Sequence, residues 1–182
     1  MRSTSTDFRR RHRLAGVLVA LVLSAVAVTV ASPAAASPQA DAALQASIDA
    51  QLRLAPGGTQ ISRNQVAWNG DSVIMTFPEP ASTPSKVALA PRCPGGGWAC
   101  FFEDRDWGGR MLQFRSCGYI QWFSDYGFEN QTSSWHNRQA FRSVNVFDVA
   151  EGELWFMEQG NVSSSYVGDR RNDKADYFRI NC

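Results

Sequence analysis

The C-terminal half of the sequence predicts an all-β domain. Residues 93–182 contain short runs in which apolar and polar side chains alternate, and glycine-rich turns separate these runs. No stretch in this region has apolar residues at helical spacing over the length of a helix. The runs expected to form strands are 99–103, 110–115, the neighbourhood of Trp135, 143–148, 153–158 and 176–181.

Two similar polar loops indicate that one β-motif is used twice. Asn130-Gln131-Thr132-Ser133-Ser134 and Asn172-Asp173-Lys174-Ala175-Asp176 begin about 42 residues apart, and each follows two strand-like runs. Their amide, hydroxyl and carboxylate oxygens are the hard ligands that calcium prefers. The candidate ligands are Asn130, Ser133, Asn172, Asp173 and Asp176. The alternative is that these residues only close turns by bonding their own backbone.

A smaller segment, residues 37–77, precedes this domain. Leu44, Ile48 and Leu52 share one face of an expected helix over 41–54, which stops at Pro56-Gly57-Gly58. The runs 65–68 and 72–77 flank Asn69-Gly70-Asp71, which is a hairpin signal. One helix and one hairpin make a poor core alone, so we expect the segment to pack on the main domain or to serve as a pro-segment.

Prolines mark the joint between the two parts. Pro78, Pro80, Pro84 and Pro91 punctuate residues 78–92, which show little hydrophobic periodicity. This composition is typical of a semi-rigid linker.

The first 36 residues have the pattern of an export signal. Arginines at positions 9, 10, 11 and 13 precede an apolar run over 14–31, and Ala34-Ala35-Ala36 offers small residues for cleavage. A membrane anchor is the alternative, because the run is near the spanning length. We expect cleavage, a secreted extracellular protein and no membrane association afterwards.

Charge argues against nucleic acid as a partner. Removing residues 1–36 takes away five arginines and Asp7, so the net charge falls from 18 − 17 to 13 − 16, or −3. A mildly acidic chain without a basic cluster lacks the positively charged surface that nucleic acid binding requires.

We expect the mature protein to be a monomer.

The four cysteines predict two disulfides in an exported chain. They are Cys93, Cys100, Cys117 and Cys182, and they allow three pairings. We favour Cys93 with Cys117, closing the first hairpin, and Cys100 with Cys182, tying the last strand to the first. A zinc site is the other possibility, but close Cys-x-x-Cys pairs are absent.

No catalytic constellation is recognisable, so we do not expect an enzyme. His136 is the only histidine that remains after signal removal, and neither His-Glu-x-x-His nor Gly-x-Ser-x-Gly occurs. Cysteines in disulfides cannot act as nucleophiles.

The C-terminal half of the chain resembles a known protein family. Phe102, Trp107 and Gly109 form an aromatic corner, and together with the loop 130–134 they resemble the Greek-key motif of the βγ-crystallins. Residues 144–148 and 172–176 resemble a second copy. The resemblance implies a βγ-crystallin-like double Greek-key sandwich over 93–182. Within the βγ-crystallins, the chain most resembles peptidase inhibitor family 36, the small actinobacterial inhibitors similar to the Streptomyces metalloproteinase inhibitor. The features that carry this closer resemblance are Cys93-Pro94-Gly95, the domain length and the export signal.

That resemblance implies a secreted inhibitor that blocks an extracellular peptidase with a rigid loop. The preferred loop is 118–128, ahead of 159–169, because aromatic side chains are typical interface anchors. The proposed protease-binding residues are Tyr119, Trp122, Phe123 and Tyr126. The same aromatics could instead cover the core. The alternative function is a calcium-binding structural or cell-surface module without inhibitory activity.

The chain also departs from the family pattern. Glu129 stands where the first loop of the family has Asn or Asp, and Asp176-Tyr177 replace a hydroxyl pair. No cysteine lies between residues 118 and 181, whereas the family staples its protease-binding loop with a disulfide of its own. No reactive bond can therefore be assigned.

Overall fold

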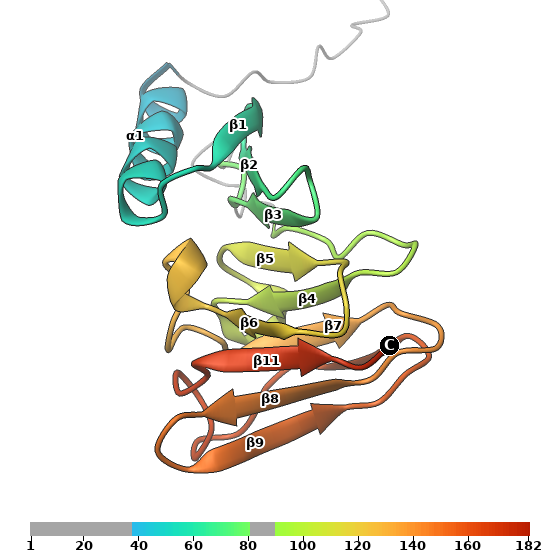
Figure 1. Ribbon diagram of the computed structural model, residues 1–182. Coiled ribbons are helices and arrows are strands. Elements are labelled where there is room, and N and C mark those ends of the chain that lie inside the picture. Colours follow the sequence, from blue (N-terminus) through green and yellow to red (C-terminus); the bar gives the residue numbers. More distant parts are fainter. Residues whose placement is uncertain (1–37, 81–89) are drawn as a thin grey trace, which may run out of the picture. The chain divides into compact units, whose positions relative to one another are not determined.

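The computed structural model describes residues 38–80 and 90–182 (Figure 1). The expected signal peptide and residues 81–89 of the expected linker lie outside these ranges. The described residues belong to one of the two units into which the chain divides. They form two antiparallel sheets and one α-helix, so the expected all-β class with a preceding helix and hairpin is confirmed.

Eight strands in the C-terminal half form two equivalent four-strand motifs. The first motif contains β4 (Ala99–Phe102), β5 (Met111–Phe114), β6 (Ile120–Trp122) and β7 (Ser134–Asn137). The second contains β8 (Val144–Asp148), β9 (Gly152–Met157), β10 (Val162–Ser164) and β11 (Tyr177–Ile180). Short 3₁₀ turns lie at Arg105–Trp107 and Ser124–Tyr126.

Each motif lends its third strand to the sheet of the other. The larger sheet contains the order β5-β4-β7-β10, and the smaller sheet has the order β9-β8-β11-β6 (Figure 1). In each sheet, the first, second and fourth strands come from one motif and the remaining strand is the third strand of the other motif. This exchange defines a double Greek-key sandwich, and it explains why neither motif can form its sheet alone.

Matching backbone hydrogen bonds confirm the internal repeat. Ser133 N donates to Phe102 O, and Asp176 N donates to Phe147 O, both at 2.9 Å. Ser133 O accepts from Val167 N, and Asp176 O accepts from Phe123 N, again both at 2.9 Å. Ser133 and Asp176 are thus equivalent, so the repeat is 43 residues rather than 42, and Asn130 corresponds to Asp173.

The N-terminal segment extends the larger sheet. Helix α1 (Pro38–Leu54) is followed by β1 (Thr59–Ser62), β2 (Gln65–Trp68) and β3 (Val73–Thr76). Strand β3 pairs with β5, which places β3, β2 and β1 in that order beyond the first Greek-key motif. The β2–β3 turn has positive φ at Asn69, Gly70 and Asp71, the backbone geometry that these residues tolerate best.

Side chains from both sheets and from α1 share one core. Leu44 and Ile48 of the helix belong to the same buried cluster as Phe101, Phe114 and Phe178. The phenylalanines pack with ring centroids 4.5–6.0 Å apart, mostly edge to face, a favourable arrangement for aromatic pairs. The helix therefore covers part of the core that the sandwich would otherwise expose.

The disulfides are Cys93–Cys100 and Cys117–Cys182, so the favoured pairing was wrong although all four cysteines are oxidised. Cys100 lies on β4 of the larger sheet, whereas Cys182 follows β11 of the smaller sheet. Gly118 N donates to Ile180 O at 2.9 Å, which brings Cys117 beside the end of β11. The exchange of strands between sheets, which sequence spacing did not reveal, determines this pairing.

Candidate functional site

Four of the five predicted calcium ligands line one polar pocket. Asn130, Ser133, Asn172 and Asp173 border a cavity of about 620 Å³ together with the turn between β4 and β5. That turn adds Asp104, which sequence reasoning did not single out because carboxylates are common on turns. The two loops thus meet at one site although 43 residues separate equivalent positions.

The loops are held in matching turns. Asn130 has φ of 55° and Asp173 has φ of 56°, the left-handed region that Asn and Asp tolerate better than most residues. Asn130 N donates to Ala175 O at 3.0 Å, and Asp173 N donates to Thr132 O at 3.4 Å. Each loop is therefore positioned by the other motif.

The Asp173 carboxylate contacts the side chains of both Asn172 and Ser133. Asn172 Nδ2 donates to Asp173 Oδ2 at 2.6 Å, and Ser133 Oγ lies 3.5 Å from Asp173 Oδ1. Asn172 Oδ1 is buried and accepts no hydrogen bond from the described residues. A buried acceptor without a donor is costly, and a cation would satisfy it.

The donor set suits a hard cation. No three His, Cys, Asp or Glu side chains gather into a metal-binding group within residues 38–80 and 90–182. The pocket instead combines carboxylate, amide and hydroxyl oxygens, which calcium accepts. Arg105 also lines the pocket, but its guanidinium donates to Tyr166 Oη at 2.8 Å and packs over the Tyr166 ring.

Asp176 lies at a different place. It is 8% exposed, and its Oδ2 accepts a 2.7 Å hydrogen bond from Val149 N in the β8–β9 turn. Asp148 Oδ1 in turn accepts from Ala150 N and Glu151 N at 2.7 and 2.6 Å. These carboxylates already cap backbone N–H groups, so Asp176 does not complete the Asn172 pocket.

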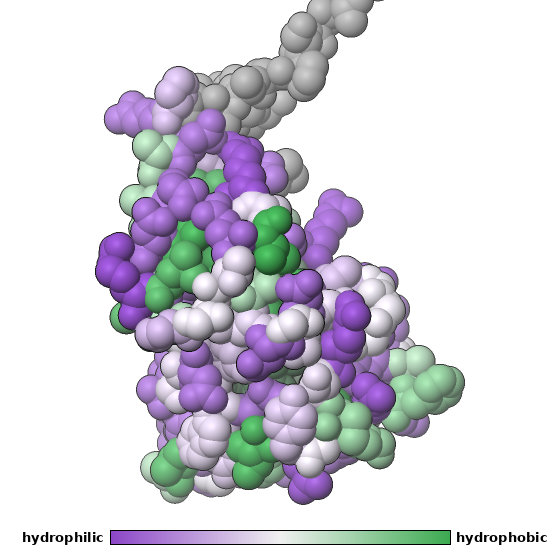
Figure 2. All heavy atoms as spheres, turned by 45° about the horizontal axis from the view of Figure 1, so that its top comes forward, coloured by the Kyte–Doolittle hydropathy of each residue, from purple (hydrophilic) through white to green (hydrophobic). Residues whose placement is uncertain are grey.

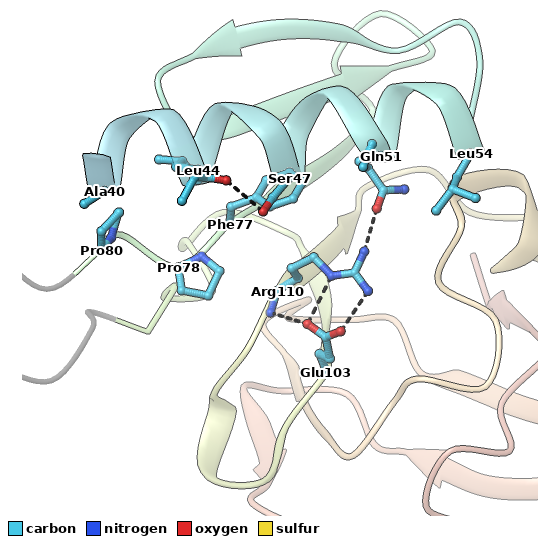
Figure 3. A pocket seen from close by; sticks show the side chains of 12 residues that line it. Ala40, Leu44, Ser47, Gln51, Leu54, Phe77, Pro78, Pro80, Glu103 and Arg110 are labelled. Carbon is cyan, nitrogen blue, oxygen red and sulfur yellow. Dashed lines mark hydrogen bonds and ion pairs between the residues drawn. The ribbon is translucent and has the colours of Figure 1, made fainter. Parts of the chain in front are cut away.

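Arg110 connects helix α1 to the rim of this pocket. Its Nη2 and Nε donate to Glu103 at 2.8 and 3.0 Å, and its Nη1 donates to Gln51 Oε1 at 2.5 Å (Figure 3). It also contacts Gln131 Oε1 of the first loop. Burial opposes ionisation of Glu103, but the hydrogen bonds and charge of Arg110 outweigh it and hold the pKa of Glu103 below its ordinary value.

Arg110→Met is expected to lower the free energy of unfolding by about 2 kcal/mol, because it leaves Glu103 and Gln51 Oε1 without their donor. The Arg110 and Glu103 side chains are only 18% and 33% exposed, so water compensates little. Arg105→Met is the matched control, since its pair with Asp169 is exposed and should matter by less than about 0.5 kcal/mol.

The pH dependence of unfolding gives a second readout of the Arg110 pair. A depressed folded-state pKa of Glu103 stabilises the fold above its unfolded-state pKa, and this contribution disappears as pH falls through the folded-state pKa. The stability difference between wild type and Arg110→Met should therefore shrink in acid. A constant difference from pH 7 to pH 2 in urea denaturation would contradict the assignment.

The proposed protease-binding residues divide into two groups. Tyr119 and Trp122 are 52% and 39% exposed, whereas Phe123 is fully buried and Tyr126 is 4% exposed. Phe123 packs 4.9 Å from Phe101, and burial raises the pKa of Tyr126 to about 12. Phe123 and Tyr126 are core residues and cannot anchor a partner, which corrects their assignment.

A groove of about 700 Å³ lies beside α1. Leu44, Leu54, Phe77 and Pro78 supply apolar walls, and Glu103 with Arg110 forms a polar end (Figure 3). The molecular surface carries separate hydrophobic patches among hydrophilic side chains on the face seen in Figure 2.

Comparisons with known proteins found matches among solved structures. No protein-family model and no curated protein matches the chain. Solved structures that match include one described as "Evolution of the eye lens beta-gamma-crystallin domain fold", with 17% identity, 50% of this chain, 91% of that chain and a TM-score of 0.40.

Two further matches come from bacterial domains. A mutant βγ-crystallin domain from Clostridium beijerinckii has 19% identity, covering 46% of this chain and 97% of that one, with a TM-score of 0.38. A double mutant of clostrillin in complex with nickel has 18% identity and a TM-score of 0.34, and the match covers 48% of this chain and 100% of that one. The likeness concerns the fold of about half the chain.

The exchanged third strands give residues 99–180 a βγ-crystallin-like double Greek-key fold. In this chain a helix and three further strands precede it. No helix in the described ranges is long and apolar enough to span a membrane. The two disulfides are typical of proteins from oxidising compartments.

Proposed function

We propose that this protein is a calcium-binding module of the extracellular space. The single observation that carries the proposal is the buried Asn172 Oδ1, which has no partner among the described residues. The other side-chain atom of this amide, Nδ2, donates to the Asp173 carboxylate, which also lies 3.5 Å from Ser133 Oγ. A calcium ion held by these groups would satisfy Asn172 Oδ1 and neutralise Asp173. Asn130 and Asp104 line the same pocket and would supply further oxygens.

The ion would link the two halves of the sandwich. Ser133 belongs to the first motif and Asn172 and Asp173 to the second, so binding favours the folded arrangement over any state in which the motifs separate. Few carboxylates face the pocket, which favours weak binding of roughly 10⁻⁴ to 10⁻³ M, the range of extracellular modules.

Asp173→Asn tests the proposal by titration calorimetry with calcium. The substitution keeps the shape of the side chain and tolerates the φ of 56°, but it removes the charge. We expect wild type to bind calcium and the variant to bind at least about tenfold more weakly. Asp71→Asn is the matched control, because Asp71 also has a positive φ (62°) and lies on the β2–β3 turn. Equal affinities of wild type and Asp173→Asn would refute the site.

Inhibition of an extracellular peptidase is the second candidate function. Ile120 and Trp122 on β6 and Tyr119 just before it are exposed, and the Cys117–Cys182 disulfide fixes the start of this loop. A rigid loop lowers the ordering cost of association. Stoichiometric inhibition of a secreted metallo- or serine peptidase, lost in Tyr119→Ala, would support it, whereas unchanged inhibition in that variant would place the contact elsewhere.

A further inference from the structure

A second pocket, independent of the calcium proposal, lies on the outer face of the larger sheet. Cys100, His136 and Ser163 lie opposite one another on β4, β7 and β10. The cavity beside this row has a volume of about 280 Å³. The residues that matter for its chemistry are Arg92, Phe102, Trp107, His136, Arg138 and Ser163.

Trp107 is held at the wall of this pocket in an unusual backbone conformation. Asp106 and Trp107 have φ of 53° and 60°, which is rare for bulky side chains. Trp107 N donates to Ser134 Oγ at 3.1 Å, and Asp106 N donates to Ser165 O at 2.8 Å. The turn thereby fixes a bulky indole that stays 37% exposed. Strain of this kind persists where the surrounding structure over-determines it.

The pocket carries positive charge that no carboxylate neutralises within residues 38–80 and 90–182. Arg92 and Arg138 take part in none of the ion pairs found among the described residues. Arg138 Nη1 donates to Cys93 O at 3.2 Å, which keeps its guanidinium at the pocket.

His136 adds a titratable group to the same pocket. Its Nε2 lies 3.2 Å from Asn161 Oδ1. Burial lowers the pKa of His136, the Asn161 hydrogen bond opposes this shift, and the charge of Arg138 adds to the lowering. The groups that face His136 are Arg138, Arg92, Asn161, Ser163 and Trp107, and none of them is acidic.

We propose that this pocket binds a small carboxylate carried on a flat aromatic body. The aromatic ring of the ligand would pack against Trp107. Its carboxylate would lie between the guanidiniums of Arg92 and Arg138 and accept charge-assisted hydrogen bonds, which are stronger than neutral ones. The volume is suited to one six-membered ring with its carboxylate, at the low end of small-molecule sites. The site lies apart from Asn172 and Asp173, so it can be present or absent whatever calcium does.

Sodium benzoate is the probe, followed by NMR of the Trp107 indole N–H and the His136 ring. Benzamide is the neutral control of similar shape, and acetate and inorganic phosphate test anions without a ring. We expect benzoate to bind at least about tenfold more tightly than benzamide, acetate or phosphate, because only benzoate uses both the charge and the ring. Comparable binding of benzamide, of acetate or of phosphate would overturn the proposal.

Two variants locate the site. Arg92→Gln removes an exposed charge, and Trp107→Asn replaces the indole with a residue that tolerates positive φ, so both should fold. Each should weaken benzoate binding at least about fivefold, whereas Arg179→Gln on β11 should leave it unchanged. Affinity should also rise as the pH falls through the lowered pKa of His136, because the protonated ring adds a positive charge to the pocket. His136→Gln should abolish that rise. Unchanged affinity in both Arg92→Gln and Trp107→Asn would reject the site.

Discussion

Reduction of the Cys117–Cys182 disulfide is expected to lower the free energy of unfolding by about 4 kcal/mol, against about 2 kcal/mol for Cys93–Cys100. The reason is the length of chain that each bond closes. Cys117–Cys182 spans 65 residues, whereas Cys93–Cys100 spans 7, and a longer loop removes more conformational entropy from the unfolded chain. The Cys117–Cys182 bond also ties the end of β11 to the segment after β5, and these two parts are far apart in sequence.

The two contributions can be separated from packing effects. The double variant C93A/C100A retains only Cys117–Cys182, and C117A/C182A retains only Cys93–Cys100. Comparing each variant oxidised and reduced in guanidinium denaturation isolates one disulfide, because the loss of the buried Cys100 side chain cancels. Equal changes in both variants would contradict the loop-length explanation.

Phe123→Ala is expected to cost about 3 to 5 kcal/mol, the loss typical of a buried phenylalanine. The ring is fully buried and packs against Phe101 and Phe178 at centroid distances of 4.9 and 5.0 Å. Its neighbour Trp122 supplies the matched control, since it is 39% exposed and contacts Tyr177 at 4.8 Å. Trp122→Ala should cost only about 1 kcal/mol.

This pair separates core from surface at two adjacent residues, the last residue of β6 and the one that follows it. Chemical denaturation of both variants measures the difference directly. If Trp122→Ala destabilised the protein as much as Phe123→Ala, the burial assigned to this region would be wrong. If Phe123→Ala were neutral, the ring would be free to serve as a partner anchor, as the sequence alone allowed.

Much of the fold could be predicted because apolar runs of strand length are separated by glycine-rich turns. The helix, the β2–β3 hairpin and the strands β4, β5, β8, β9 and β11 occupy the expected places. Strands β6 and β10 are three residues long and were read as loops, since so short a run shows no periodicity. Strand β1 was missed because its residues are mostly exposed and polar.

The candidate site was predictable in composition but not in connectivity. The two polar loops could be recognised from their residues, and the structure brings Asn130, Ser133, Asn172 and Asp173 together. Asp176 was also predicted to be a calcium ligand, because its position in the sequence does not show that its carboxylate caps a backbone N–H group of another turn. This cap depends on the β8–β9 turn, which folds back and brings Val149 N to Asp176 Oδ2.

The disulfide pairing and the aromatic residues of loop 118–128 were uncertain for the same reason. Phe123 and Trp122 are adjacent, yet one faces the core and the other faces solvent. Without the strand β6, the sequence gives no basis for deciding which side is which. Cys117 likewise reaches Cys182 only because β6 pairs with β11.

The most direct test of calcium binding is the side-chain amide resonance of Asn172 during a calcium titration followed by NMR. A cation that binds Asn172 Oδ1 should shift the Nδ2 protons, with smaller shifts at the backbone amides of Ser133 and Asp173. These shifts should follow one binding curve, which should move to at least about tenfold higher calcium in Asp173→Asn and stay unchanged in Asp71→Asn. A titration to millimolar calcium that leaves Asn172 unmoved, or that shifts only Asp176 and Val149, would contradict the proposed site.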